Sequence, residues 1–511
     1  MQQVVGLDEM YLSLDTGRTV GHVAAIAVFD PHEPERDELE FLRTRIAERL
    51  TTLPILRFQL SSLPLHLTGR YFADGEVSLD EHVQRVQVPS PGTDAQFKEV
   101  LDQLMRPILE RDRPMWRMWL VEGLEGGRYA YVLKLSHGMA DGSVVWKVFD
   151  QLSDTPAEHL PEVPIRKEPV GGTAELVARA LGQWATMPMR GMFLQGQTAW
   201  WAIGRLRSEG AGFLLDTLAR AVPGELSRPL VHLANRDLDG TGHAGHRVAS
   251  LVPSIMPPHT PFNGTVTPNL TIEEFDLQVA DLSRIGKLVG GTVNDALLAV
   301  TAGAMRRYLA AHGGIPERPV VVSAPISWRD GTEKERWANQ VWMLYLALPT
   351  HLADPMERLL YAQRAADTAK FNWDGMPSHL TRKASEWMPT ATMAPMTKLM
   401  SLMPGAFLPK LYNVSISNVR GPKTAPSYGG EPIEKYFVYG FLPPGCGMLV
   451  AGQSLESRMV LTATVCRDIV VDHATLPGLL QQSLDELLAL TETAPIRGVK
   501  TRRPSRSSAA R

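Results

Sequence analysis

The sequence predicts an α/β protein built from two domains. Segments with the two-residue alternation of strands, and segments with the three-to-four-residue spacing of helices, occur in both halves of the chain. A stretch rich in proline and charge, 161–169, separates the halves. The chain has 511 residues, which is enough for two or three domains with cores of their own. We therefore expect a mixed sheet with flanking helices in each half.

The first half, residues 1–160, is predicted to form one domain. Its apolar patterns predict strands at 20–29, 116–124 and 128–136, an extended run at 80–89, and helices at 37–50, 94–109 and 144–152. Only Glu125, Gly126 and Gly127 lie between the second and third of these strands, which predicts a hairpin. His82, in the extended run, is interpreted as a structural histidine.

Residues 161–244 are predicted to form a helical connection, rich in Met, Trp and Phe, and residues 245–495 a second domain. For this domain we predict strands at 270–277, 320–324, 341–348, 414–418, 436–439, 447–454 and 459–465, and helices at 280–287, 292–312, from 354 and at 477–490. Residues 496–511 contain six basic residues and no acid, which predicts a disordered basic tail.

The segment 388–411 has methionine and other apolar residues at helical spacing. Met396, Met400 and Met403 lie on one face with Phe407, and three prolines divide the segment into shorter pieces. Such a face suits either the interior of a domain or contact with lipid chains and a bilayer surface, because methionine side chains adapt to irregular apolar partners.

The composition excludes several classes of protein. The formal net charge of −3 gives no indication of nucleic-acid binding. The two cysteines, Cys446 and Cys466, predict neither a disulfide framework nor a metal site. The N-terminal residues lack the order of a secretory signal, and no apolar run reaches the length of about 18–20 residues that a membrane span needs. We expect a cytoplasmic protein, with a peripheral position on the inner membrane or on lipid droplets left open.

The candidate catalytic residue is His137, at the end of the predicted strand 128–136. On strand periodicity it continues the face of Tyr129, Tyr131, Leu133 and Leu135. A neutral imidazole can take a proton from a hydroxyl, so His137 suits a general base. Gly138 and Gly142 fit a sharp exit from the strand and a close approach of the backbone.

Two other polar positions each have a structural and a functional interpretation. Asp141 either caps the following helix or serves His137, by holding its ring through a direct bond or by anchoring the loop through an arginine. Asn294 and Asp295 lie in the first turn of the predicted helix 292–312, where such side chains either cap the helix or serve a site.

An ordered set of short blocks resembles the bacterial wax ester synthase/diacylglycerol acyltransferase family, within the chloramphenicol acetyltransferase-like superfamily. The resemblance extends from Met1 to about Leu490. The blocks are Asp112-Arg113-Pro114-Met115-Trp116, the motif at 136–142, Asn263-Gly264, Val293-Asn294-Asp295, Ala338-Asn339-Gln340 with Leu348-Pro349, and Asn418-Val419-Arg420-Gly421-Pro422.

The resemblance implies two similar chloramphenicol acetyltransferase-like domains with a channel between them. It also implies that the second histidine of an H-H-x-x-x-D-G motif, here His137, is the general base. Ser136 stands at the position of the first histidine. Activity survives this change if the first histidine mainly supports the substrate's position, and it is reduced or lost if both histidines are needed.

The resemblance further implies an O-acyltransferase that moves a long-chain acyl group from acyl-CoA to diacylglycerol or a fatty alcohol. Acyl-CoA would be a co-substrate, with no cofactor and no metal. Ser136, Gly138, Asp141 and Gly142 would support the motif. Asn294 and Asp295 would support the oxyanion or the substrate, and Pro114, Met115 and Trp116 would lie in the acyl-channel region.

Two alternatives remain at this point. One is a condensation-domain-like acyltransferase, which shares the motif layout. The other is a non-catalytic protein with the same fold that binds lipid or acyl-CoA, which the serine at position 136 permits.

Overall fold

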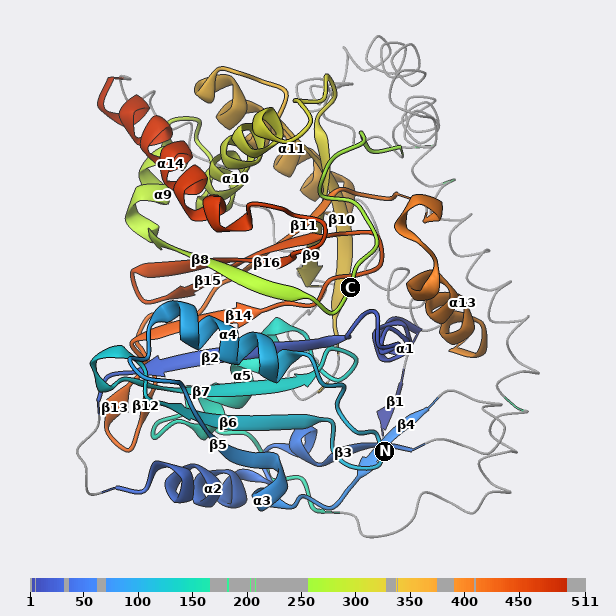
Figure 1. Ribbon diagram of the computed structural model, residues 1–511, viewed down its shortest axis with the longest axis vertical. Coiled ribbons are helices and arrows are strands. Elements are labelled where there is room, and N and C mark those ends of the chain that lie inside the picture. Colours follow the sequence, from blue (N-terminus) through green and yellow to red (C-terminus); the bar gives the residue numbers. More distant parts are fainter. Residues whose placement is uncertain are drawn as a thin grey trace.

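The computed structural model describes residues 2–4, 6–31, 36–61, 70–165, 182, 203, 207, 256–327, 337, 339–374, 390–408 and 410–493. These residues form two large β-sheets, each with helices packed against it (Figure 1). Both sheets contain parallel and antiparallel neighbours. The predicted mixed sheets with flanking helices are therefore confirmed. Most of the predicted helical connection, and the basic tail, lie outside the described residues.

The first sheet has five strands in the order β14-β2-β7-β6-β5. These are β14 (Lys435–Tyr439), β2 (His22–Phe29), β7 (Tyr129–Ser136), β6 (Trp116–Glu122) and β5 (Val83–Gln87). The helices of this half are α1 (Gly6–Ser13), α2 (Glu38–Arg49), α3 (Leu79–His82), α4 (Asp94–Met105) and α5 (Gly142–Leu152). A small sheet joins β1 (Gln2–Gln3), β4 (Tyr71–Asp74) and β3 (Phe58–Ser61).

The second sheet has six strands in the order β10-β9-β11-β15-β16-β8. These are β10 (Val341–Leu348), β9 (Val320–Ser327), β11 (Val414–Val419), β15 (Met448–Leu455), β16 (Arg458–Cys466) and β8 (Leu270–Gln278). Helices α9 (Val279–Lys287), α10 (Val293–Ala311), α11 (Pro355–Asp374) and α14 (Leu476–Thr493) lie on the side of this sheet that faces away from the first (Figure 1).

The helix α13 (Thr390–Leu402) lies beside α1 at one side of the molecule (Figure 1). Pro395 lies within it, and the chain then breaks at Pro404 before a short 3₁₀ turn, Gly405–Phe407. The predicted division of the segment 388–411 into shorter pieces is thus confirmed at Pro404 and wrong at Pro395.

The two faces of strand β7 are both buried, each in a different core. Tyr129, Tyr131, Leu133 and Leu135 are buried in the core of the first half. The alternate residues, including Ala130 and Val132, are buried in a core shared with α4 and with strands of the second sheet. Because neighbouring strand residues point to opposite sides, one strand supplies two cores.

Most other predicted elements are found within a few residues of their expected ends. The helix predicted at 94–109 ends earlier, at Met105. The prediction of extended chain from residue 80 is wrong for its first residues, since Leu79–His82 form a short helix before β5. Both ring nitrogens of His82 lie near backbone carbonyls, those of Ser78 (2.9 Å) and Pro114 (3.2 Å), which fits the structural interpretation of this residue.

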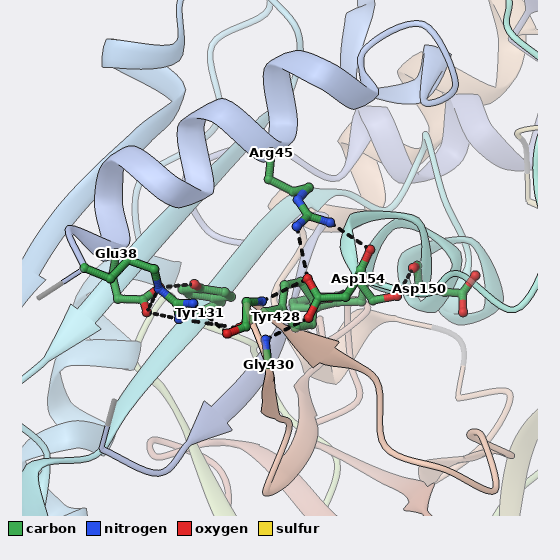
Figure 2. A network of polar contacts seen from close by, with 11 residues as sticks. Glu38, Arg45, Tyr131, Asp150, Asp154, Tyr428 and Gly430 are labelled. Atoms are coloured by element: carbon green, nitrogen blue, oxygen red, sulfur yellow. Dashed lines mark hydrogen bonds and ion pairs between the residues drawn. The ribbon is translucent and has the colours of Figure 1, made fainter. Parts of the chain in front are cut away.

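The two halves of the sequence are interleaved in space. Strand β14, from the second half, pairs with β2 at the edge of the first sheet. The preceding hairpin of β12 (Ser427–Tyr428) and β13 (Glu431–Pro432) is held by first-half residues (Figure 2). The Asp154 carboxylate accepts hydrogen bonds from the amides of Gly429 and Gly430, each at 2.9 Å, and pairs with Arg45 at 3.0 Å. The sequence pattern gave no indication of this exchange.

Candidate active site

His137 follows the last residue of β7 and is half-buried. Its amide donates to the Gly21 carbonyl at 2.8 Å, which ties the residue to the start of β2. The imidazole stacks on the ring of Tyr11 with 4.2 Å between centroids and 28° between planes. Phe441 meets it edge-on at 4.8 Å. The backbone of His137 is thus held by the start of β2, and its ring by Tyr11 and Phe441.

Burial lowers the pKa of His137 below its ordinary value, because water no longer stabilises the imidazolium. The residue's own backbone carbonyl, Asp141 and Asn339 act in the opposite direction and reduce this shift. The imidazole is therefore neutral at pH 7. Its Nδ1 atom is buried and has no hydrogen-bond partner in another residue of the described structure. A neutral imidazole has the protonation state that a general base requires.

Gly138 allows helix α1 to approach the His137 loop. A Cβ atom at this position would lie 2.6 Å from Leu12 Cγ and 2.9 Å from the Asp8 carbonyl oxygen. Distances this short exclude any side chain, so the predicted close approach is confirmed at Gly138. At Gly142 a Cβ atom would meet only Val419 Cγ2 at 3.4 Å, an ordinary contact, and the backbone does not need glycine there.

Asp141 is the N-cap of α5, as one of the two interpretations expected. Its Oδ1 accepts from the amides of Ser143 (3.0 Å) and Val144 (3.1 Å). Its Oδ2 accepts from the amide of Gln340 at 3.0 Å. One carboxylate thus starts the helix and binds the second half of the chain. The arginine partner implied by the resemblance stays a prediction.

Asn339 closes the site from the second half. Its Nδ2 donates to the His137 carbonyl at 2.6 Å and to Asp8 Oδ1 at 2.8 Å. These bonds join residues more than 200 positions apart in the sequence. Asn339 and Gln340 belong to a block that the resemblance had singled out, but no role was predicted for them.

Ser136 points away from the His137 ring. It is fully buried and lies directly opposite His22 of β2. The neighbouring residues His137 and Gly21 are hydrogen-bonded to each other. Since such pairs alternate along antiparallel strands, Ser136 and His22 form a non-hydrogen-bonded pair, with Cα atoms about 4.5 Å apart. His22 Nε2 lies 3.3 Å from Asp15 Oδ2. The position of the missing first histidine therefore faces a buried His–Asp pair on the opposite side of the sheet from His137.

Asn294 and Asp295 begin α10. Asp295 and Thr292 form a capping box, in which Asp295 Oδ2 accepts from the Thr292 amide at 2.7 Å. Burial raises the pKa of Asp295. Asn294 Oδ1 accepts from Asn418 Nδ2 at 3.5 Å, and the next residue, Val419, is the one that faces Gly142. Capping accounts for Asp295, whereas the role expected of Asn294 at the reaction centre stays a prediction.

Pro114, Met115 and Trp116 are buried at the start of β6. The Met115 carbonyl accepts from the Ser136 amide at 3.1 Å, and Trp116 Nε1 donates to the Leu56 carbonyl at 2.6 Å. These residues support strand β7, which His137 follows. Their expected place along an acyl channel stays a prediction.

Sequence reasoning located His137, Gly138 and Asp141 but missed Tyr11 and Phe441. Neither of these two lies in a recognisable motif, and α1 was not predicted at all. No helix in the described part of the chain combines the length and apolar character needed to cross a bilayer. Within the same residues, no three His, Cys, Asp or Glu side chains are grouped as metal ligands would be.

Comparison with known sequences gives matches over most of the chain. Residues 4–297 match the model of the wax ester synthase/diacylglycerol acyltransferase catalytic domain, and residues 337–488 match that of the C-terminal domain of the same proteins. A Mycobacterium tuberculosis protein named "Putative diacyglycerol O-acyltransferase" is 28% identical over 492 residues, covering 96% of this chain and 97% of that protein. A Mycobacterium bovis protein of the same name is 25% identical over 506 residues, covering 97% and 92%.

Solved structures show the same fold. The wax ester synthase/diacylglycerol acyltransferase of Marinobacter aquaeolei superposes with a TM-score of 0.63 at 19% identity, covering 96% of this chain and 100% of that one. The starter condensation domain of rhizomide synthetase, solved with C8-CoA, gives a TM-score of 0.55 at 12% identity, covering 96% and 95%. At these identities the likeness concerns the fold alone.

Proposed function

Because the chain belongs to the wax ester synthase/diacylglycerol acyltransferase family, and so is an acyl-CoA-dependent acyltransferase that makes triacylglycerol or wax ester, we propose that His137 is its general base. Acyl-CoA is the co-substrate in this family. The observation that carries the proposal is the state of the imidazole. It is neutral, half-buried, and fixed by Tyr11, Phe441 and the Asn339 bond to its carbonyl.

The proposed reaction is a direct transfer at His137. The imidazole takes the proton of the acceptor hydroxyl as that oxygen attacks the thioester carbonyl. The tetrahedral intermediate then collapses, the carbon–sulfur bond breaks, and the proton passes to the sulfur of CoA. General-base assistance of this kind contributes on the order of 10²- to 10⁴-fold in rate. Holding both reactants at one ring contributes much of the remainder.

The acceptor is proposed to be diacylglycerol or a fatty alcohol. An assay of thiol release from palmitoyl-CoA, with hexadecanol and diolein offered together, distinguishes these acceptors through the products formed. Thiol release that depends on an acceptor, with formation of an ester, supports the transferase. Acyl-CoA binding without thiol release under any acceptor would instead support the non-catalytic lipid-binding alternative.

The pH dependence of the reaction tests the base directly. Since burial lowers the pKa of His137, the neutral form persists below pH 6.5. We expect kcat/KM to be constant around pH 7 and to fall with acid through a midpoint below 6.5, because kcat/KM reports the free enzyme. The measurement is a pH–rate profile with a soluble acyl-CoA. A midpoint at or above 6.5 would contradict the assignment.

Ser136 is compatible with activity in this proposal. Its side chain lies on the sheet face of His22 and Asp15, whereas His137 lies on the other. A histidine at position 136 would therefore point away from the reactants. It would affect the reaction only by changing the packing that supports the His137 loop. We infer that the serine leaves the proposed base in place.

We also infer that the enzyme works at a lipid surface, where its apolar acceptors reside. The exposed side chains of Met396, Leu399, Leu402, Phe407 and Leu411 form what we name the apolar ridge. Leu399 is 62% exposed and Phe407 is 73% exposed, and large apolar side chains grouped at a surface are typical of a protein or membrane interaction site. The surrounding segment, 390–411, contains two lysines and no acidic residue.

The apolar ridge is adjacent to the reaction centre. Helix α13 packs against α1, whose Tyr11 stacks on His137. Arg18 Nη1 donates to the carbonyl of Leu402 at 2.6 Å and fastens the end of α13 to the same region. Among the described residues, helix α1 therefore contacts both the helix that carries most of the ridge and the ring of His137. The lysines favour an anionic surface.

Vesicle binding tests this surface. We expect the wild type to co-sediment with phosphatidylcholine vesicles containing phosphatidylglycerol. The double variant Leu399→Ser/Phe407→Ser should bind at least about tenfold more weakly, because each apolar side chain removed from lipid costs on the order of 1–2 kcal/mol. Val471→Ser, which alters an exposed apolar side chain elsewhere, is the matched control. Equal binding by the double variant and the control would show that the apolar ridge does not bind the vesicles.

A further inference from the structure

Tyr11 is the side chain in closest ring contact with His137. It is 1% exposed, and its ring lies nearly parallel to the imidazole with 4.2 Å between centroids. Phe441 packs edge-on against both rings, at 5.2 Å from Tyr11 and 4.8 Å from His137. A phenylalanine at position 11 would make these same ring contacts. The hydroxyl group therefore needs a separate explanation.

The Tyr11 hydroxyl is buried and has no hydrogen-bond partner among the described residues. A buried polar group left unpaired is destabilising, so its presence calls for an explanation. The fold thus retains a group that weakens it at the one place where an acyl group and an alcohol are proposed to meet. A partner that is present only during the reaction would account for this.

The surroundings of the hydroxyl keep it a donor. Burial, and then the charges of Asp8 and Asp141, raise the pKa of Tyr11 well above its ordinary value, so the phenol carries its proton throughout the neutral range. Asp141 accepts instead from Ser143, Val144 and Gln340, and Asp8 from Asn339. Neither carboxylate accepts a hydrogen bond from the Tyr11 hydroxyl.

We propose that Tyr11 is a catalytic residue whose hydroxyl donates a hydrogen bond to the thioester carbonyl oxygen of the acyl-CoA. This proposal rests on the proposed role of His137. As the acceptor oxygen bonds to the carbonyl carbon, its proton passes to His137 and the carbonyl electron pair moves to the oxygen that Tyr11 faces. When the carbon–sulfur bond breaks, the pair returns and the proton on His137 goes to the thiolate. Tyr11 keeps its own proton throughout.

In this proposal the groups that act on the reactants come from both halves of the chain. His137 and Tyr11 act from β7 and α1 of the first half. Asn294, predicted to support the oxyanion, begins α10 in the second half. Fixed donors aimed at the atom where charge develops stabilise the transition state more than the substrate. The loss of one such donor should appear in kcat rather than in KM.

The test is Tyr11→Phe, which removes only the hydroxyl. We expect kcat to fall about 10- to 100-fold, somewhat less than for a stronger oxyanion donor, with KM for both substrates within about threefold of wild type. The Tm should be unchanged or higher, because an unpaired polar atom is lost from the interior. An unchanged kcat, a loss confined to KM, or a lowered Tm would each overturn the proposal.

Tyr436→Phe is the matched control. Tyr436 is also 1% exposed, and its hydroxyl also has no partner among the described residues. It packs on Trp146 and Phe149. It pairs with Ala27, which lies five residues along β2 from His22, so that Ala27 and His22 are about 16 Å apart. We expect this variant to keep wild-type kcat. An equal loss of kcat in both variants would show a general effect of hydroxyl removal and overturn the assignment.

His137→Ala, assayed in parallel, separates the two proposals. If His137→Ala is inactive and Tyr11→Phe has wild-type kcat, only the role of Tyr11 fails. If His137→Ala keeps full turnover, the general base itself is wrong, and the role of Tyr11 falls with it.

Discussion

Replacement of His137 by alanine is expected to lower kcat for acyl transfer by about 10²- to 10⁴-fold, the usual contribution of a general base. The imidazole is half-buried at the end of β7, so its removal leaves the two flanking cores intact. The measurement is thiol release from acyl-CoA at saturating acceptor, together with thermal unfolding. Turnover equal to that of wild type would exclude His137 as the base.

Ser136→Ala gives the comparison for the neighbouring position. Ser136 faces His22 on the other side of the sheet, and its Oγ has no partner among the described residues. We expect kcat within about threefold of wild type, since removing an unpaired buried hydroxyl costs little. A loss comparable to that of His137→Ala would mean that position 136 takes part in the reaction. It would also revive the interpretation that both motif positions are needed.

Asp141→Ala is expected to have the second-largest effect, on both stability and rate. The substitution removes the N-cap of α5, worth about 1 kcal/mol. It also leaves the buried amide of Gln340 without its acceptor, at a cost of about 1–3 kcal/mol. We expect the free energy of unfolding to fall by about 2–4 kcal/mol and kcat by at least about tenfold, as the loop that holds His137 shifts. Chemical unfolding and thiol release measure the two effects.

Asp141→Asn separates capping from the contact between halves. Its single side-chain oxygen can accept either from the α5 amides or from Gln340, but it cannot serve both as the carboxylate does. An intermediate loss of stability is therefore expected. A stability of Asp141→Ala within about 0.5 kcal/mol of wild type would show that neither contact stabilises the fold as inferred here.

Much of the fold follows from local pattern. The alternation along β7 predicted its two buried faces, and the apolar spacing after residue 141 predicted α5. The aspartate that precedes this helix was already recognisable as a cap. These features depend on interactions between residues a few positions apart, which sequence spacing records directly.

The partners of His137 could not be predicted in the same way. Helix α1 has eight residues and no strong apolar face in its sequence, so nothing marked Tyr11 as a neighbour of His137. The exchange of β14 into the first sheet was equally hidden, because any apolar alternating strand fits either sheet edge. Contacts of this kind are selected by the packing of the whole chain rather than by local preference.

The sequence by itself determined that a histidine ends a buried strand, that an aspartate follows at the start of a helix, and that two mixed sheets form. Tertiary structure alone decided that Ser136 faces His22 and that Tyr11 stacks on His137. It also decided that Asn339 binds the His137 carbonyl. The physical reason is separation along the chain. Strand alternation fixes which way a side chain points, whereas only the folded backbone fixes what it meets there.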